Sequence, residues 1–231
     1  GITVATIGMA GAFYANAFSF LAVVLALSLM KGVPERSTAG TRRTLRSDLV
    51  EGLTYVSKTH LILILLVLSA ITNIFGRSYQ QLLPAFARGV LHEGSLGLGL
   101  MMSAPGAGTL VGAGAMAVLN DARRKGVVFF CAMVASSLVL VLFTFNRSFP
   151  LALGLLFLFG VASIVFSTML TTMLQLEAPD HMRGRVMSLV TVTMQGFAPF
   201  GSLLTGAVAT GIGTPEAIAA SAAVLGLAAV V

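Results

Sequence analysis

The sequence predicts an all-α polytopic membrane protein, a bundle of helices that cross the lipid bilayer. Hydrophobic residues make up 57% of the 231 residues and charged residues only 10%, whereas an ordinary soluble domain carries roughly 25% charged residues. The mean hydropathy is +0.97. Several charge-free stretches also exceed the ~20 apolar residues that a helix needs to cross ~30 Å of hydrocarbon.

The composition argues against several other classes. The net charge of +6 would suggest a nucleic-acid partner in a soluble chain, but here the Lys and Arg stand almost entirely in short connections between apolar runs, where they indicate topology. Cys131 is the single cysteine, and His60, His92 and His181 lack metal-ligand spacing, so we expect no disulfide, metal or cofactor. The predicted spans contain no paired acidic or histidine side chains, so we expect no enzyme.

We expect seven membrane spans, and the first is separated from the others by a linker. Residues 1–30 would hold the tail of one helix, a tight turn near Gly8 and Gly11, and a first complete span over about 12–30. Residues 31–60 are basic and contain Gly and Pro, as expected of a linker. Asp48 and Glu51 form a capping-box pattern there, which predicts a short amphipathic helix on the membrane surface.

The other six spans would form a bundle over residues 61–231. We place them at about 61–84, 96–119, 127–145, 150–175 and 186–210, with a last one that starts near Pro215. Because the chain begins at Gly1 without a methionine or a basic leader and ends at Val231 inside an apolar run, we expect a fragment without a signal peptide.

A polar turn between two of these spans is marked by Pro179 and Asp180. Pro179 would end the incoming helix. Asp180 would cap the outgoing helix, and its negative charge would interact favourably with the N-terminal end of the helix dipole. Eleven Lys and Arg residues lie in the linker and around the turns near Asp121 and Asp180, against two, Arg88 and Arg147, in the opposite loops. Because cytoplasmic loops collect positive charge, we expect the linker and both turns in the cytosol.

The six spans repeat a three-helix order, in which a polar-striped span is followed by a glycine-rich span and a bland apolar span. The stripes consist of Ser69, Asn73, Arg77 and Gln80 or Gln81 in one unit and of Ser163, Ser167, Thr171 and Gln175 in the other. The glycines are Gly106, Gly108, Gly112 and Gly114 in one unit and Gly196, Gly201 and Gly206 in the other. Two such units suggest the inverted-topology repeats of a secondary transporter, although small residues, Ser and Thr are common in any membrane helix.

Four stretches resemble the major facilitator superfamily of transporters. Residues 179–188, PDHMRGRVMS, resemble the loop between its tenth and eleventh helices, especially in the exporter branch that includes the enterobactin exporter and macrolide exporters. Residues 48–56, DLVEGLTYV, look like the start of helix seven in that branch, and residues 82–87, LLPAFA, look like the outer end of that helix. Residues 120–126, NDARRKG, look like a degenerate copy of the cytoplasmic loop motif, with alanine at one usual glycine and one usual basic position of the motif.

This resemblance implies that the seven spans are helices six to twelve of a twelve-helix transporter and that the linker is its central cytoplasmic loop. The N-terminal half of the same transporter would then be the missing partner. The implied function is efflux of a small amphiphilic cargo, drug-like or siderophore-like, across the inner (plasma) membrane by alternating access, with protons as one candidate coupling ion. A non-transporting membrane scaffold or receptor domain is the alternative, since it could share the spans without a polar cavity.

We expect polar side chains to line the substrate pathway, namely Ser69, Asn73, Arg77, Gln80, Gln81, Ser167, Thr171, Gln175 and Gln195. Any one of these could instead form a hydrogen bond between helices. Arg77 is the single charge well inside a span. It could bind an anionic group of the cargo or a carboxylate of the missing half, or it could snorkel from ~28 Å up the helix to the outer interface.

Two further sets of residues have structural roles in this hypothesis. A cytoplasmic gate, made and broken as the halves rock, would consist of Asp121, Arg123, Arg124, Asp180, Arg183 and Arg185; solvated topology loops are the alternative. Close helix packing would rest on Gly108, Gly112, Gly201 and Gly206. We expect the glycine-rich spans to pack against the other half and the bland spans to face lipid.

Overall fold

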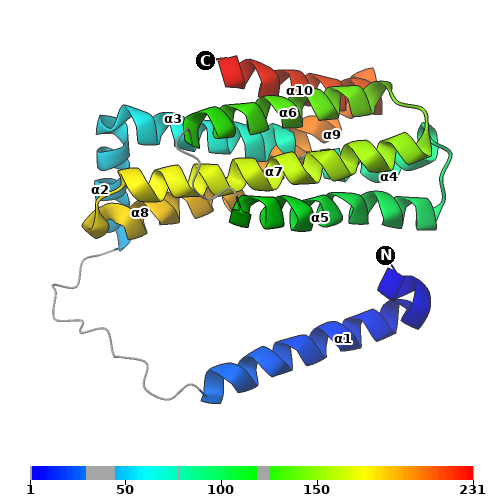
Figure 1. Cartoon of the computed structure of the whole chain (residues 1–231), viewed down its shortest axis with the longest axis horizontal. Helices are drawn as coiled ribbons and strands as arrows, with labels where there is room; N and C mark the ends of the chain where they lie inside the picture. The colour runs from blue at the N-terminus through cyan, green and yellow to red at the C-terminus, as the bar shows by residue number, and fades with distance from the viewer. Residues whose placement is uncertain (1, 30–44, 78, 119–124, 231) are drawn as a thin grey trace. The chain divides into compact units, whose positions relative to one another are not determined.

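The computed structural model describes residues 2–29, 45–77, 79–118 and 125–230 of the chain (Figure 1). The chain divides into two compact units, residues 1–48 and 49–231. The first unit holds helix α1 (Ile2–Leu29) and the start of α2 (Leu45–Lys58). Helix α1 runs unbroken through Gly8 and Gly11, so the tight turn predicted there is wrong.

The elements described in the second unit are all helical, which confirms the all-α class. After α2 they are α3 (His60–Ile71), η1 (Thr72–Gly76), α4 (Tyr79–Gly89), α5 (Ser95–Val118), α6 (Lys125–Phe145), α7 (Phe149–Glu177), α8 (Asp180–Thr191), η2 (Val192–Gly196), α9 (Ala198–Ile212) and α10 (Thr214–Val230). The label η marks a short stretch of π-helix. Successive spans run in opposite directions, so the α4–α5 and α6–α7 connections lie at one end of the bundle and the α7–α8 turn at the other (Figure 1).

Five helical segments in the described residues are long and apolar enough to cross a membrane. They are His60–Gly89, Ser95–Ala117, Lys125–Phe145, Phe149–Glu177 and Asp180–Ile212. The other two predicted spans correspond to the shorter apolar helices Phe13–Leu29 and Thr214–Ala229. Length and composition therefore confirm a multi-pass membrane protein and support five of the seven predicted spans.

Two helix boundaries differ from the prediction. The span that we ended at Pro84 continues through the proline to Gly89, because a membrane helix can compensate for the missing backbone N–H through its neighbours. Asp48 is the fourth residue of α2 and stands inside the helix, so the capping box predicted there is wrong.

The break between α7 and α8 falls where proline predicted it. Helix α7 ends at Glu177, and Ala178 is extended, with ψ of 124°, as expected of a residue before proline. Pro179 occupies the N-cap position of α8, and no side chain caps this helix. Asp180 is the first residue of α8, so its negative charge still favours the helix N-terminus although it does not cap it.

Two apolar clusters stabilise the bundle toward its two ends. One gathers around Ile62, Met133, Leu170, Leu174 and Val186, and the other around Leu83, Phe86, Phe143, Leu156 and Ile218, all of them fully buried. Each cluster contains a stacked aromatic pair, with ring centroids 4.9 Å apart for Phe129 and Phe166 and 4.5 Å apart for Phe86 and Phe143. Three buried polar residues, Ser69, Asn73 and Ser136, lie along their helices between the residues of the two clusters.

Glycine lets α5 and α7 approach until their backbones touch. A Cβ atom at Gly108 of α5 would overlap the Phe157 carbonyl of α7, and one at Gly160 of α7 would overlap the Pro105 carbonyl of α5. Small residues allow this kind of contact between membrane helices, where van der Waals packing replaces the hydrophobic effect as the main attraction.

The other predicted packing glycines divide into two groups. Gly112 also faces α7, and Gly201 of α9 lies against the Ile74 carbonyl of η1. Gly108, Gly112 and Gly201 therefore pack inside this bundle, as expected of packing glycines. That the glycine-rich spans also pack against a second half stays a prediction. A Cβ atom at Gly206 would meet nothing within 4 Å among the described atoms, so no packing role is visible for it.

The two bland spans, α6 and α10, were expected to be apolar on nearly every face and to stand against lipid, and each has one packed and one exposed face. They pack against each other, and the Ser137 hydroxyl of α6 donates a 2.7 Å hydrogen bond to the Ala222 carbonyl of α10. The opposite face of α6 is an exposed apolar stripe made of Val127, Phe130, Val134, Leu138, Leu142 and Phe145. That stripe is the surface suited to lipid.

The backbone contact at Gly160 gives a test of the packing. We expect Gly160→Val to lower the unfolding free energy by about 1–3 kcal/mol, because the new methyl groups would push α5 away from α7. Gly154→Val on the same helix is the matched control, since a Cβ at Gly154 meets nothing within 4 Å. Thermal denaturation of the complete protein in detergent measures both changes, and equal midpoints for the two variants would contradict the close approach.

Candidate functional site

Two facing spans change from α-helix to π-helix where they meet. Stretch η1 (Thr72–Gly76) joins α3 to α4, and η2 (Val192–Gly196) joins α8 to α9. The Ser69 and Thr193 hydroxyl oxygens are 3.3 Å apart across this contact. A π turn redirects the side chains that follow it, and such turns occur frequently at functional sites.

Side-chain hydrogen bonds accompany both π turns. The Thr72 hydroxyl donates to the Leu68 carbonyl, and the Asn73 amide donates to the Ser69 carbonyl, each at 2.8 Å. The Thr193 hydroxyl likewise donates to the Val190 carbonyl at 2.7 Å. Because that bond uses the single Thr193 hydroxyl proton, the Ser69 hydroxyl is the donor in the contact between the two spans. Bonds of this kind to the preceding turn bend helices.

Two cavities open beside the π turns and share part of their walls. The larger one measures about 320 Å³ and carries hydroxyl groups from Thr72, Thr109, Ser136, Ser163 and Ser167 and aromatic rings from Tyr79, Phe159 and Phe166. The smaller one measures about 260 Å³ and is lined by Asn73, Arg77, Gln80, Gln81, Gln195 and Ser202, with Met194 and Ala198. Asn73, Arg77, Gln80 and Met194 belong to both cavities. We call these the hydroxyl cavity and the amide cavity.

Arg77 stands where η1 passes into α4, and its side chain is exposed to both cavities. No ion pair joins it to another residue that the structure describes. It lies near the middle of the span His60–Gly89 rather than at its end. Its position on the walls of both cavities favours a cavity residue over a side chain that snorkels to the outer interface.

Four of the seven remaining pathway candidates line a cavity. Gln80, Gln81 and Gln195 line the amide cavity, and Ser167 lines the hydroxyl cavity.

Three candidates lie outside both cavities. Ser69 is fully buried at the contact between the two spans. Thr171 donates to the Ser167 carbonyl at 2.9 Å, and Gln175 is exposed near the end of α7. The structure therefore does not bring these three residues to the site.

Several lining residues escaped the sequence prediction. Tyr79 is 2% exposed, and its ring meets Phe159 edge to face with centroids 4.8 Å apart. Thr109 lies in the glycine-rich span and Ser136 in a bland one, where single hydroxyl groups carry no periodic signal. The sequence does contain one feature common to the two π turns. Each stretch, TNIFG at Thr72–Gly76 and VTMQG at Val192–Gly196, has polar residues followed by a glycine in the middle of a span.

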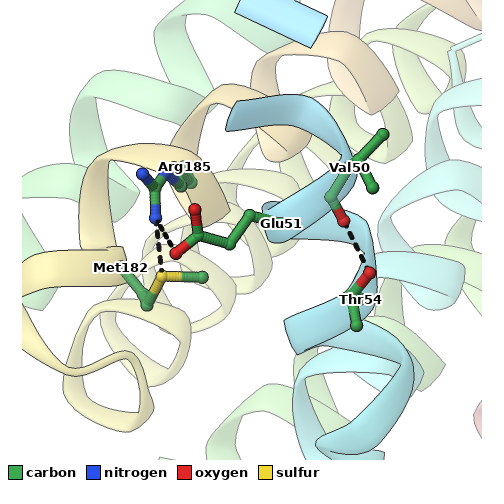
Figure 2. Close-up of polar contacts among 5 residues, drawn as sticks. All are labelled: Val50, Glu51, Thr54, Met182 and Arg185. Carbon is green, nitrogen blue, oxygen red and sulfur yellow. Dashed lines mark hydrogen bonds and ion pairs between the residues drawn. The ribbon is translucent and has the colours of Figure 1, made fainter. Parts of the chain in front are cut away.

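At the α7–α8 turn, Arg183 pairs with Asp180 inside the predicted cluster, whereas Arg185 pairs with a residue outside it. Figure 2 shows the contacts of Arg185. Arg185 Nη1 of α8 lies 2.7 Å from Glu51 Oε1 of α2 and 3.1 Å from Met182 Sδ. Arg183 pairs with Asp180 of its own helix, at 2.9 Å, and its Nε donates to the Gln175 carbonyl at 3.2 Å.

The other half of the predicted gate, Asp121, Arg123 and Arg124, lies outside the described residues. Among the described residues, Glu51 on α2 forms an ion pair with Arg185. Within the described ranges, no three His, Cys, Asp or Glu side chains gather where they could hold a metal ion.

A bundle of membrane-length helices around a polar interior is typical of a transporter. The profile of the transmembrane secretion effector family matches residues 1–231, and the chain belongs to this family of the major facilitator superfamily.

Known efflux pumps are among its relatives. The multidrug efflux pump Tap of Mycolicibacterium fortuitum is 26% identical over 218 residues, which cover 92% of this chain and 52% of that protein. The multidrug efflux pump Tap of Mycobacterium tuberculosis is 25% identical over 209 residues, which cover 89% of this chain and 49% of that protein. The chain spans about half the length of the curated relatives it matches.

Cysteine labelling tests whether the amide cavity contains water. In a Cys131→Ser background, we expect Gln81→Cys and Ser202→Cys to react rapidly with a charged, membrane-impermeant thiol reagent, because only a hydrated thiol ionises readily. Leu142→Cys, on the exposed apolar stripe of α6, should react slowly although its side chain is also exposed. Equal rates at the three positions would show that the cavity is not a separate aqueous space.

Proposed function

We propose that this chain forms one half of a secondary transporter that exports small amphiphilic molecules by alternating access. The observation that carries the proposal is the pair of polar cavities between the two apolar clusters of a membrane bundle. Polar side chains in a membrane interior are costly, and where they persist they commonly mark a substrate or ion pathway. The relatives named as multidrug efflux pumps support export as the direction of transport.

The exposed side of the cavities supports a second half that faces this one. Arg77, Gln80, Gln81 and Gln195 are all exposed, and hydrocarbon would leave their polar groups without partners. A second helical bundle with water between the halves would satisfy them. The family relationship supports such a partner, because the curated relatives are about twice as long as this chain.

The charge distribution supports the orientation. We propose that the linker, α2 and the α7–α8 turn lie on the cytoplasmic side of the inner (plasma) membrane, because the basic residues concentrate there. The Glu51–Arg185 pair then ties the cytoplasmic helix α2 to α8, which continues directly into η2 at the cavities. We propose that this contact between α2 and α8 changes as the two halves rock.

Efflux measurements test the transport function. In cells that express the complete transporter, we expect lower accumulation of an amphiphilic dye than in cells without it. Gln195→Leu should lower the efflux efficiency roughly 5- to 10-fold, because the cargo or the bound water loses one hydrogen-bonding amide. Thr210→Leu, an exposed substitution at the far end of α9 that lines neither cavity, should leave efflux unchanged.

Two outcomes would reject this proposal. Equal dye accumulation with and without the complete transporter would contradict export. Equal loss of efflux in the Gln195 and Thr210 variants would remove the amide cavity from the pathway and favour a non-transporting scaffold for this half.

A charge exchange tests the cytoplasmic contact. We expect Arg185→Glu alone to change the transport rate by up to about fivefold, since a partly exposed ion pair is worth ~0.2–1 kcal/mol. Combining it with Glu51→Arg should restore most of the rate, because the pair forms again with its signs reversed. Rates that simply multiply in the double variant, with no coupling between the two positions, would show that the pair does not act in the transport cycle.

A further inference from the structure

The charge of the two cavities is unbalanced. Arg77 is the single charged residue that lines either of them, and the other polar groups on their walls are neutral amides and hydroxyls. The acidic residues whose side chains the structure describes line neither cavity: Glu51 within α2, Glu93 in a connection, and Glu177, Asp180 and Glu216 at helix ends. This half of the pathway therefore presents a cation without a described carboxylate.

An arginine in such a place requires a counterpart. A guanidinium inside a membrane bundle is unfavourable unless an anion or water compensates its charge. Its planar donors match the two oxygens of a carboxylate better than they match a neutral or cationic group. Asn73, Gln80 and Gln195 add neutral donors on the same wall, and none of them brings a competing negative charge.

The hydroxyl cavity adds space for an apolar group next to this anion site. Tyr79, Phe159 and Phe166 supply aromatic surface there, and the volume of about 320 Å³ is well above the roughly 150 Å³ of a cavity that binds one benzene ring. Arg77 and Asn73 line both cavities. One molecule can therefore place its charged end beside Arg77 and its ring system against the aromatic wall.

We propose that the cargo site selects aromatic carboxylates, with Arg77 holding the carboxylate and the hydroxyl cavity holding the ring system. This inference rests on the proposed transport function and adds the charge of the preferred cargo. It makes Arg77 a specificity-determining residue that favours organic anions over neutral and cationic molecules of the same shape.

Three dansyl compounds that differ in charge test this selection. Dansylglycine is anionic, dansylamide is neutral and dansylcadaverine is cationic, while all three share one aromatic body. Their binding to the complete transporter in lipid nanodiscs is measured by fluorescence anisotropy, with empty nanodiscs as the blank. We expect dansylglycine to bind about tenfold more tightly than dansylamide, as a charge-assisted hydrogen bond would give, and dansylcadaverine to bind most weakly.

Variants assign the selection to one residue. Arg77→Gln should bring the affinities for dansylglycine and dansylamide to within about twofold of each other by weakening the anion alone. Arg77→Lys, which keeps the charge, should retain part of the preference. Arg88→Gln is the matched control, because Arg88 lies in the last turn of α4 and lines neither cavity. Its preference should equal that of the wild type.

Several results would overturn the proposal. These are a wild-type preference for dansylcadaverine, no binding of any probe, a preference that survives Arg77→Gln, and an equal loss of affinity for all three probes in that variant. If Arg77→Gln cannot be purified, the wild-type series and Arg77→Lys still decide. Transport of the same probes from proteoliposomes separates the two claims, because export without charge preference rejects this inference and leaves the transport function intact.

Discussion

Hydrocarbon offers no hydrogen-bond partners, and this constraint determines where the polar residues of the bundle lie. Asn73 satisfies part of its amide by bonding the Ser69 carbonyl, and the Ser69 hydroxyl reaches Thr193 on the facing span. No hydrogen bond or ion pair to another described residue satisfies the side chains of Arg77 and Gln195, and both border the amide cavity. Water, cargo or a second half must supply their partners, which is why the cavity is the center of the functional interpretation.

Helix geometry responds to the same constraint. The two π turns place polar side chains on the cavity walls while side-chain hydroxyls and an amide bond the nearby carbonyls. Glycine makes the surrounding packing tight, with Gly160 and Gly201 each set against a carbonyl of a neighbouring span. The bundle thus combines close backbone contacts with two open cavities, and the apolar clusters toward its ends keep this arrangement in place.

The sequence predicted the features that depend on local chemistry. The all-α membrane class follows from composition, the break at Pro179 from proline stereochemistry, and the placement of Asn73 and Gln80 on one side from helical spacing. Contacts between distant elements could not be predicted in this way. The Glu51–Arg185 pair joins residues 134 positions apart, and the π turns depend on the packing of two spans that no local pattern brings together. Helical spacing also placed Ser69, Thr171 and Gln175 on the polar faces, but these residues lie outside the cavities. Periodicity predicts which face of a helix a residue occupies, and it does not predict how far along the helix a cavity extends.

The meeting of the two π-containing spans is the central claim, and a cysteine pair tests it most directly. In the complete transporter with Cys131→Ser, the double variant Ser69→Cys, Thr193→Cys replaces two hydroxyl oxygens that lie 3.3 Å apart. Mild oxidation should convert the pair into a disulfide, which mass spectrometry of the digested protein detects as one linked peptide. Two cysteines that stay reduced under these conditions, with the protein folded, would show that the spans do not meet there and would contradict this account.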